Sequence, residues 1–428
     1  LARYFVAKGC VVNGYDKTKT ILTEALSELG IEIHYEDNID LIDKNASVVV
    51  YTPAIPESHS ELAYYRANGY EVVKRSDILG WITEGTVNIC VAGTHGKTTV
   101  STMIAHLLRD SGYGCTAFLG GIAANYNTNF WSSDNNVVVV EADEYDRSFL
   151  KLHPSVAVIT SMDADHLDIY KTPESFEDAF VSFSEKVKAG GLLLAKKGLA
   201  REASFDTSKL VTYSLNGNSA SIYAKDITVV NGAYIFTAVG PSWQIEELVL
   251  NMGGLHNIEN ALVAVSVAVH LGIEPQKIKA ALANFAGVKR RFEYLIKTAS
   301  QVLIDDYAHH PAELAALITG VRSLYPEQKL TLVFQPHLFS RTQDLCDGFA
   351  DSLSAADEVV LLPIYPAREL PIPGVTSEMI AHKMTFKNVA LLQKEELSSW
   401  VKAQKPKLLV MAGAGDIDVL IRNIKNDL

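Results

Sequence analysis

Short apolar runs alternate with amphipathic segments along most of the chain. Four of these runs are Val87–Ala92, Val137–Val140, Val156–Thr160 and Leu330–Phe334. Apolar runs of this length, bounded by glycine or polar residues, are typical of buried strands. Strands that alternate with helical segments are typical of parallel sheets covered by helices. The pattern therefore predicts an α/β protein.

The alternation restarts twice, which predicts three domains over residues 1–85, 86–294 and 295–428. A single core rarely grows beyond ~250 to 300 residues, so a chain of this length also favours several domains. The first and third domains are expected to be doubly wound and Rossmann-like. Within the second domain, residues 209–250 are rich in strands and N-G turns, which predicts an inserted β-meander without catalytic chemistry.

The beginning of the chain has the pattern of half a nucleotide-binding unit. The segment L-A-R-Y-F-V-A-K-G predicts the end of a helix, and a strand from Cys10 to Tyr15 leads to Asp16. Helix, strand and strand-end acid form the back half of a dinucleotide-type βαβ unit. We therefore expect a strand and a Gly-rich diphosphate loop to precede Leu1.

The stretch G-T-H-G-K-T, residues 93–98, joins a predicted strand to a predicted helix. Glycines in such a loop let backbone N–H groups surround phosphate oxygens, while Lys97 can reach the β- and γ-phosphates and Thr98 can bind Mg²⁺. The strict motif has another glycine at the position of Val91. The alternative is an ordinary glycine turn, but the Lys-Thr pair that follows favours a nucleoside triphosphate.

Acidic residues follow the next strand, in the sequence E-A-D-E-Y-D. Glu141 comes directly after Val137–Val140, and a metal-binding carboxylate is expected at the carboxyl end of a strand beside a phosphate loop. Glu144 and Asp146 fit a solvated loop well, whereas Glu141 does not. Glu141 is therefore the preferred metal ligand.

His166 follows the strand Val156–Thr160 and lies close in sequence to Asp163, Asp165 and Asp168. A single histidine is more often structural than a ligand. Its position after a strand end, among acids, makes a metal-binding role an equal alternative.

Two amides and two arginines are further candidates for ligand contacts. Asn257 and Asn260 share one face of a predicted helix, where they can contact a purine edge. The alternative is that Asn257 caps the helix and Asn260 is solvated. Arg290 and Arg291 lie in A-G-V-K-R-R-F-E, which is either a phosphate-binding linker or a solvated basic hinge.

Polar residues of the third domain gather after its predicted strands. Ligands bind at the carboxyl edges of such sheets, so these residues predict one wall of a cleft. The residues are Asp305, Asp306, His309, His310, Gln335, His337, Ser340, Arg341, Tyr365, Arg368 and the turn at 412–416.

The composition excludes several classes of protein. The net charge of −12 and the pI near 5.5 disfavour binding to nucleic acid. No apolar run approaches the ~18 residues needed to cross a bilayer, and no secretion signal opens the chain, which predicts a cytoplasmic protein without membrane contacts. The four cysteines are scattered without CxxC spacing, which predicts reduced thiols.

Taken together, the motifs resemble those of the Mur ligases. The motifs occur in the family's order across the whole chain: G-T-H-G-K-T, E-A-D-E-Y-D, D-A-D-H-L-D, H-N-I-E-N-A, K-R-R-F-E, D-D-Y-A-H-H-P and Q-P-H-L-F-S-R-T. His95 and the string D-A-D-H-L-D-I-Y indicate the alanine-adding branch. The resemblance implies three domains: a UDP-sugar-binding Rossmann-like domain, a central P-loop ATPase domain, and a Rossmann-like domain that closes on the nucleotide and the amino acid.

The implied reaction is ATP-dependent amide formation between L-alanine and the lactyl carboxylate of UDP-N-acetylmuramate. A carboxylate is inert to an amine, so it first receives the γ-phosphoryl group and becomes an acyl phosphate. Two Mg²⁺ ions would offset the repulsion between the carboxylate and the triphosphate. Imidazole is an unusual magnesium ligand, so Mn²⁺ is expected to substitute.

The resemblance also implies roles for individual residues. The nucleotide-binding set is Gly93, Thr94, His95, Gly96, Lys97, Thr98, Thr99, Asn257, Asn260, Arg291 and Asp306. The metal ligands are Thr98 and Glu141 for one ion and His166 for the second. His337 and Arg341 are candidates for the amino-acid side, and His337, a nearby acid or water could take the proton of the amine.

Two departures from the family pattern keep alternatives open. Val181 stands near the place where several Mur ligases carry a carbamylated lysine, and the alanine-adding branch also lacks that lysine. The expected Gly-rich loop before Leu1 is absent, which leaves a nucleotide-binding but catalytically impaired form as one alternative. The other is the ligase that attaches recycled tripeptide to UDP-N-acetylmuramate. Monomer and homodimer are both compatible with the sequence.

Overall fold

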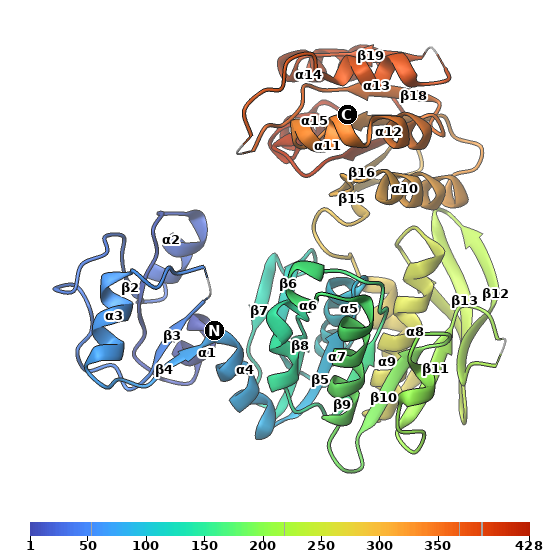
Figure 1. Cartoon of the computed structure of the whole chain (residues 1–428). Helices are drawn as coiled ribbons and strands as arrows, with labels where there is room; N and C mark the ends of the chain where they lie inside the picture. Colours follow the sequence, from blue (N-terminus) through green and yellow to red (C-terminus); the bar gives the residue numbers. More distant parts are fainter. Residues whose placement is uncertain (53, 218, 368, 387) are drawn as a thin grey trace. The chain divides into compact units, whose positions relative to one another are not determined.

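The computed structural model describes residues 1–52, 54–217, 219–367, 369–386 and 388–428, and for Ile21, Asp168 and Asp427 it describes the backbone only. The chain divides into two compact units. Figure 1 labels the helices and strands along the chain. Unit 1 comprises Leu1–Lys97, Gly112–Gly120 and Asn129–Thr212, and unit 2 comprises Thr98–Ser111, Gly121–Thr128 and Tyr213–Leu428. Among the described residues, no helix is long and apolar enough to span a membrane.

The beginning of unit 1 contains two small parallel sheets. Strand β1 (Asn13–Tyr15) pairs with β2 (Glu32–His34), and β3 (Val49–Tyr51) pairs with β4 (Val72–Lys74). The helices here are α1 (Ala2–Ala7), α2 (Ile21–Ser27), α3 (Ser60–Ala67) and α4 (Arg75–Glu84). The predicted strand Cys10–Tyr15 was too long, because Val11 is 89% exposed and pairing starts at Asn13.

A sheet that is parallel in the pairs described forms the larger part of unit 1. Its central strand, β5 (Val87–Ala92), has the predicted bounds and pairs on its two sides with β8 (Val137–Glu141) and β9 (Val156–Ile159). The strand order continues as β10-β9-β5-β8-β6-β7. The remaining elements are β6 (Thr116–Ala123), β7 (Thr128–Trp131), β10 (Leu192–Lys196), η1 (Tyr145–Lys151), α6 (Leu167–Tyr170), α7 (Pro173–Glu185) and η2 (Glu202–Ser204).

Aromatic side chains fill the core under this sheet. Phe176, Phe180 and Phe183 of α7 are fully buried and pack with Phe149 of η1. Spacings of three and four residues place the three α7 side chains on one helix face. This packing fixes η1, and with it the acidic segment that follows β8.

Unit 2 begins at Thr98, the second residue of α5 (Lys97–Asp110). It also contains the predicted meander. Strands β12 (Ile222–Val230), β13 (Ala233–Gly240) and β14 (Trp243–Leu250) are antiparallel, whereas β11 (Leu210–Ser214) pairs with β12 in parallel. The turn between β12 and β13 is the predicted N-G pair, and both residues have positive φ. Helices α8 (Leu255–His270) and α9 (Pro275–Asn284) follow.

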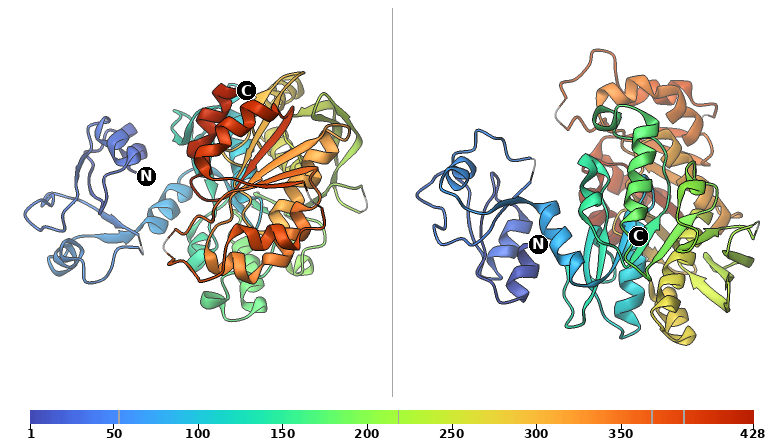
Figure 2. Two further views of the ribbon diagram at one scale, coloured as in Figure 1. Left: turned by 90° about the horizontal axis from the view of Figure 1, so that it is seen from above. Right: turned by 60° about the horizontal axis from the view of Figure 1, so that its bottom comes forward.

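The end of unit 2 is a doubly wound sheet in the order β15-β16-β20-β17-β18-β19, and Figure 2 shows helices on both of its faces. Only β15 is antiparallel among the pairs described. The strands are β15 (Glu293–Lys297), β16 (Val302–Asp306), β17 (Leu330–Phe334), β18 (Glu358–Leu361), β19 (Val389–Leu391) and β20 (Leu408–Ala412). The other elements are α10 (Pro311–Leu324), α11 (Phe339–Asp344), α12 (Cys346–Leu353), α13 (Ser377–Lys383), η3 (Lys394–Glu396), α14 (Leu397–Gln404) and α15 (Ile417–Asp427).

None of the four cysteines forms a disulfide bond, as predicted. Cys90, Cys115 and Cys346 are buried, and Cys10 is exposed.

Candidate active site

The glycine loop lies between β5 and α5, as the sequence predicts. Gly93 has a φ of +136° and Gly96 a φ of +83°, and residues other than glycine rarely adopt such positive φ angles. A Cβ atom on Gly93 would lie 2.1 Å from Thr160 Oγ1, so only glycine permits this approach to the end of β9. Thr98 and Thr99 are buried in the first turn of α5.

The residues after β9 hold the loop in place. Thr160 Oγ1 donates to His95 O at 2.5 Å, and His95 N donates to Ser161 Oγ at 2.7 Å. Thr94 Oγ1 donates to Asp163 O at 2.7 Å. The loop is therefore preorganised by side-chain bonds, which lowers the conformational entropy that phosphate binding must overcome.

Lys97 is held inside its own loop and against a buried acid. Its Nζ donates to Gly93 O at 2.6 Å and to Glu144 Oε1 at 2.7 Å. The Glu144 side chain is 1% exposed, so the prediction that Glu144 belongs to a solvated loop is wrong. Burial raises the pKa of Glu144, and the Lys97 ammonium opposes that rise.

Glu144 also has an oxygen without a bond. Its Oε2 is buried and finds no hydrogen-bond partner among the described residues. The backbone is fixed nearby, because Tyr170 OH donates to Glu144 O at 2.5 Å. An unpaired buried carboxylate oxygen is uncommon in proteins and marks a position where a ligand, an ion or a water is expected.

His166 lies next to this ion pair. It has a left-handed backbone, with φ of 51°, and its Nε2 is 3.9 Å from Glu144 Oε1. The ring of Tyr145 packs edge-on against it, with 5.2 Å between centroids. Lys97, Glu144 and His166 therefore form one cluster. The side chain of Asp168 lies outside the described residues.

Glu141 ends β8, as predicted. Its Oε2 accepts a hydrogen bond from Gly120 N at 3.0 Å. Glycine at this position brings the backbone of β6 close to the carboxylate. The bond fixes the direction of one oxygen.

In unit 2, Asn257 and Asn260 lie on the same face of α8. Asn260 Nδ2 donates to Asn257 Oδ1 at 2.9 Å, and Asn257 Nδ2 donates to Gly253 O at 2.6 Å. Both side chains are buried, and the N-cap residue is Gly254, which offers no side-chain bond. The alternative of a capping Asn257 and a solvated Asn260 is therefore wrong. The ring of Phe292 packs where a Cβ of Gly253 would lie, beside this first turn.

The two arginines before β15 differ in their surroundings. Arg291 is exposed, whereas Arg290 donates to Gly413 O in the glycine turn after β20, and its Nε lies 3.9 Å from Asp305 Oδ2. Burial raises the pKa of Asp305 to about 7, and Arg290 opposes that rise. The alternative of a solvated basic hinge is therefore wrong for Arg290.

Asp306 is engaged by the backbone of its own loop. Its two oxygens accept from Phe292 N and Ala308 N, each at 2.7 Å. Burial raises the pKa of Asp306 to about 6, although both amide donors oppose this rise. Through these two hydrogen bonds the carboxylate fixes the loop after β16.

His337 and Arg341 follow β17, as predicted. The imidazole of His337 stacks on Tyr365 with ring centroids 5.7 Å apart, and His309 lies 6.1 Å away. Burial lowers the pKa of His337, and the nearby Arg341 and His309 lower it further. Buried His337 Nδ1 and one Arg341 nitrogen find no partner among the described residues. Arg368 lies outside the described residues.

Sequence profiles of one family match most of the chain. The profile of the Mur ligase family, catalytic domain, matches residues 1–86, that of the Mur ligase middle domain matches residues 91–268, and that of the Mur ligase, glutamate ligase domain, matches residues 290–421.

Relatives of known name match the chain over its whole length. The UDP-N-acetylmuramate--L-alanine ligase of Parabacteroides distasonis is 49% identical and covers 100% of this chain and 94% of its own. The ligase of the same name from Flavobacterium johnsoniae is 47% identical, with coverage of 100% and 94%.

Solved structures share the fold. The crystal structure of the UDP-N-acetylmuramate-alanine ligase from Thermotoga maritima has a TM-score of 0.80 at 26% identity and covers 99% of this chain and 95% of that chain. A murein peptide ligase from Psychrobacter arcticus has a TM-score of 0.62 at 22% identity, with coverage of 100% and 95%. By its sequence and its three-domain α/β fold, the chain belongs to the Mur ligase family.

Proposed function

We propose that this chain is an ATP-dependent ligase that joins L-alanine to the lactyl carboxylate of UDP-N-acetylmuramate through an acyl phosphate. The single observation that carries the proposal is the loop around Lys97, a phosphate-binding geometry in a chain 49% identical to a ligase of that name. The domains proposed for this reaction are residues 1–85 for the UDP-sugar, 86–294 for ATP and 295–428 for closure on nucleotide and amino acid.

The residues of the loop fit a triphosphate. Gly93 and Gly96 carry no side chain, and the first turn of α5 begins directly after them. Backbone N–H groups at a helix start attract anions. Lys97 already points back over the loop, so we assign its ammonium to the β- and γ-phosphates.

The acids beside the loop fit a divalent cation. Glu141 keeps one oxygen directed by Gly120 N, and Glu144, whose Oε1 pairs with Lys97, keeps its Oε2 without a hydrogen bond among the described residues. We assign Thr98 and Glu141 to one Mg²⁺ and His166 to a second, which Mn²⁺ can replace. When bound, the ions offset the repulsion between the triphosphate and the substrate carboxylate.

Residues of unit 2 would complete the reaction. Asn257 and Asn260 offer a buried pair of amides for adenine, and Arg291 and Asp306 would contact phosphate and ribose. We assign His337 and Arg341 to the amino-acid side. Burial lowers the pKa of His337 and so favours the neutral ring, which can accept the proton that the alanine ammonium must lose before attack.

The test is release of ADP with UDP-N-acetylmuramate, ATP and Mg²⁺, with and without L-alanine. Turnover that requires L-alanine supports the proposal, and its absence refutes it. Replacing L-alanine with L-Ala-γ-D-Glu-meso-diaminopimelate separates the tripeptide-recycling activity, because a preference for the tripeptide would contradict the alanine assignment. Nucleotide binding without affinity for UDP-N-acetylmuramate would indicate a catalytically impaired form.

A further inference from the structure

Four ionisable side chains cluster at the beginning of unit 1, away from the residues assigned to the ligase reaction. His34 ends β2, and Asp37 lies in the loop that follows. His59 is the N-cap residue of α3, and Glu61 lies in its first turn. His59 and Glu61 are buried, at 8% and 5% exposed.

His59 is the unusual member of this cluster. Neither Nδ1 nor Nε2 makes a hydrogen bond with any described residue, although both atoms are buried. The ring of Tyr15 packs edge-on against the imidazole at a centroid distance of 4.5 Å. Buried ring nitrogens normally have a partner, so an unpaired imidazole in a polar cluster indicates a missing ligand.

Two carboxylates face this imidazole. One ligand atom each from Asp37, His59 and Glu61 lie within 4.8 Å of one another. The Nδ1 atom of His59 is 3.4 Å from Asp37 Oδ1. Ligand atoms at tetrahedral Zn²⁺ lie about 3.3 Å apart, as follows from bond lengths of about 2.0 to 2.1 Å. The observed separation therefore suits two ligands of one ion.

Neighbouring groups already orient both carboxylates. Glu61 Oε1 lies 2.9 Å from His34 Nε2 and accepts from Asn38 N at 2.9 Å. Asp37 accepts from Ser60 N at 3.0 Å and from Ser60 Oγ at 2.5 Å. Such outer bonds to ligating carboxylates are characteristic of metal sites.

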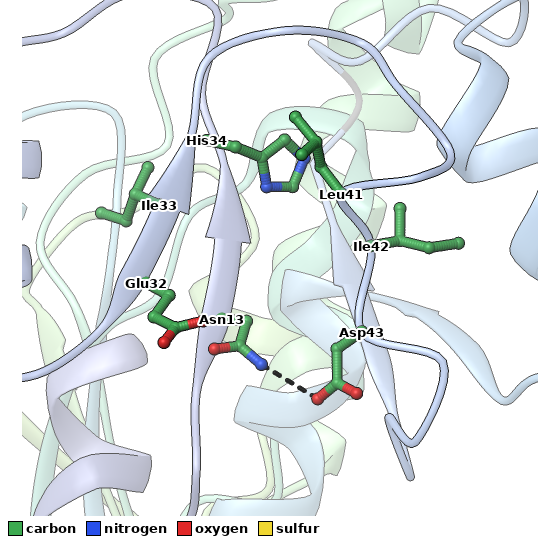
Figure 3. A pocket seen from close by; sticks show the side chains of 7 residues that line it. All are labelled: Asn13, Glu32, Ile33, His34, Leu41, Ile42 and Asp43. Carbon is green, nitrogen blue, oxygen red and sulfur yellow. Dashed lines mark hydrogen bonds between the residues drawn. The ribbon is translucent and has the colours of Figure 1, made fainter.

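A purely structural role explains only part of the cluster. Asp37 accepts hydrogen bonds at the start of α3, as a capping acid would. Capping does not explain why neither nitrogen of the buried His59 makes a hydrogen bond with a described residue, although two carboxylates lie beside the ring. His34 belongs to the cluster and also lines a pocket with Asn13, Glu32, Ile33, Leu41, Ile42 and Asp43 (Figure 3), so the cluster adjoins a surface opening.

We propose that His59, Asp37 and Glu61 form a binding site for a divalent transition-metal ion of the zinc class. An imidazole with two carboxylates favours Zn²⁺, Co²⁺ or Ni²⁺ over Mg²⁺ or Ca²⁺, which prefer oxygen ligands alone. The ion would join the loop after β2 to the start of α3. The site does not rest on the ligase assignment, because none of its residues is given an individual role in that reaction.

The test is titration of the chelator-treated chain with Co²⁺ in excess Mg²⁺, followed by visible absorption and calorimetry. We expect one Co²⁺ equivalent that His59→Gln weakens by about 100-fold or more, since loss of outer partners alone costs about 10- to 100-fold. His153→Gln is the matched control, because His153 also faces a carboxylate, Glu84 at 3.4 Å, but lies on the surface. Any Co²⁺ bound near His166 is bound equally by the unsubstituted chain and by both variants, so it does not affect the difference between them.

A second variant covers the possibility that His59→Gln does not fold. Asp37→Asn keeps one of the two acceptor oxygens, so it retains the bond from Ser60 N or those from Ser60 Oγ and Glu61 N, and it removes the charge. It should fold, as checked by circular dichroism, and should lose the rise in Tm that Zn²⁺ gives to the unsubstituted chain. Equal Co²⁺ stoichiometry and affinity in the unsubstituted chain, Asp37→Asn and His153→Gln would overturn the proposal.

Discussion

Replacing Glu144 with glutamine tests how the protein holds Lys97 before nucleotide binds. Glutamine has nearly the same shape, so the change removes the charge and keeps an oxygen that can accept from Nζ at the present 2.7 Å. The two side chains are 1% and 15% exposed, so solvent screens their interaction weakly. The variant therefore isolates the electrostatic part of the contact.

The expected loss of stability is about 2 kcal/mol. Removing one partner of a buried ion pair costs about 3–5 kcal/mol. The retained hydrogen bond from a charged donor recovers about 1.5–3 kcal/mol of this. For a unit of this size, about 2 kcal/mol corresponds to a fall in Tm of roughly 4–8 °C.

The same variant should bind nucleotide more tightly. Lys97 must exchange Glu144 for phosphate oxygens, and the carboxylate also repels them. A gain of about 1–2 kcal/mol lowers the Kd of ADP by roughly 5- to 30-fold. Calorimetric titration with ADP and differential scanning calorimetry of the nucleotide-free protein measure the two effects on the same sample.

Glu84→Gln is the control, because Glu84 is 63% exposed and pairs with His153 at the surface. Exposed pairs contribute about 0–1 kcal/mol, so neither Tm nor ADP affinity should change appreciably. The reasoning would be refuted if Glu144→Gln left Tm unchanged and weakened ADP binding. That outcome would mean that Glu144 acts on the nucleotide or its metal ion rather than on Lys97.

Three further changes test other parts of the site. Lys97→Ala should abolish turnover while circular dichroism shows the fold intact, and a near-normal rate would remove the loop from the mechanism. Asn260→Ala should raise the KM for ATP by roughly 10- to 100-fold, because it removes one of two buried amides proposed to contact adenine, and steady-state kinetics would show it. Burial raises the pKa of Asp305 in the folded state to about 7, from 3.8 for an unperturbed carboxyl group. Between these two values the folded state binds more protons than the unfolded state, so the stability falls as the pH rises from about 4 to 7. Asp305→Asn should flatten that slope in Tm measured against pH.

Strand positions were predicted well where nearly every residue of the strand is buried. Val87–Ala92 and Leu330–Phe334 have the predicted bounds, and all of their residues except Val87 are buried, as is typical of strands in a parallel sheet covered on both faces. The strand predicted from Cys10 failed at its start, since Val11 is apolar but exposed. Local sequence cannot distinguish an apolar residue that pairs within a sheet from an apolar residue that lies just before the strand and is exposed.

The site was predicted less completely than the fold. The glycine loop is a local motif, so its position between β5 and α5 could be predicted from spacing alone. Glu144 was missed because E-A-D-E-Y-D offers four acids and no periodicity that shows which one turns inward. The choice is made by left-handed backbone at Asp146 and Arg147 and by the packing of Phe149, neither of which a short motif encodes.

The same chemical arrangement occurs twice, around Lys97 and around Arg290. In each case a cation faces a buried carboxylate, Glu144 or Asp305, with one oxygen that has no partner among the described residues. Burial raises the pKa of both acids, so neither pair is optimised for stability. Each cation also bonds a backbone carbonyl of a glycine turn, Gly93 or Gly413. In both pairs the carboxylate keeps one oxygen without a partner, so drawing the cation away to an anion would cost less than breaking a pair whose oxygens are all satisfied.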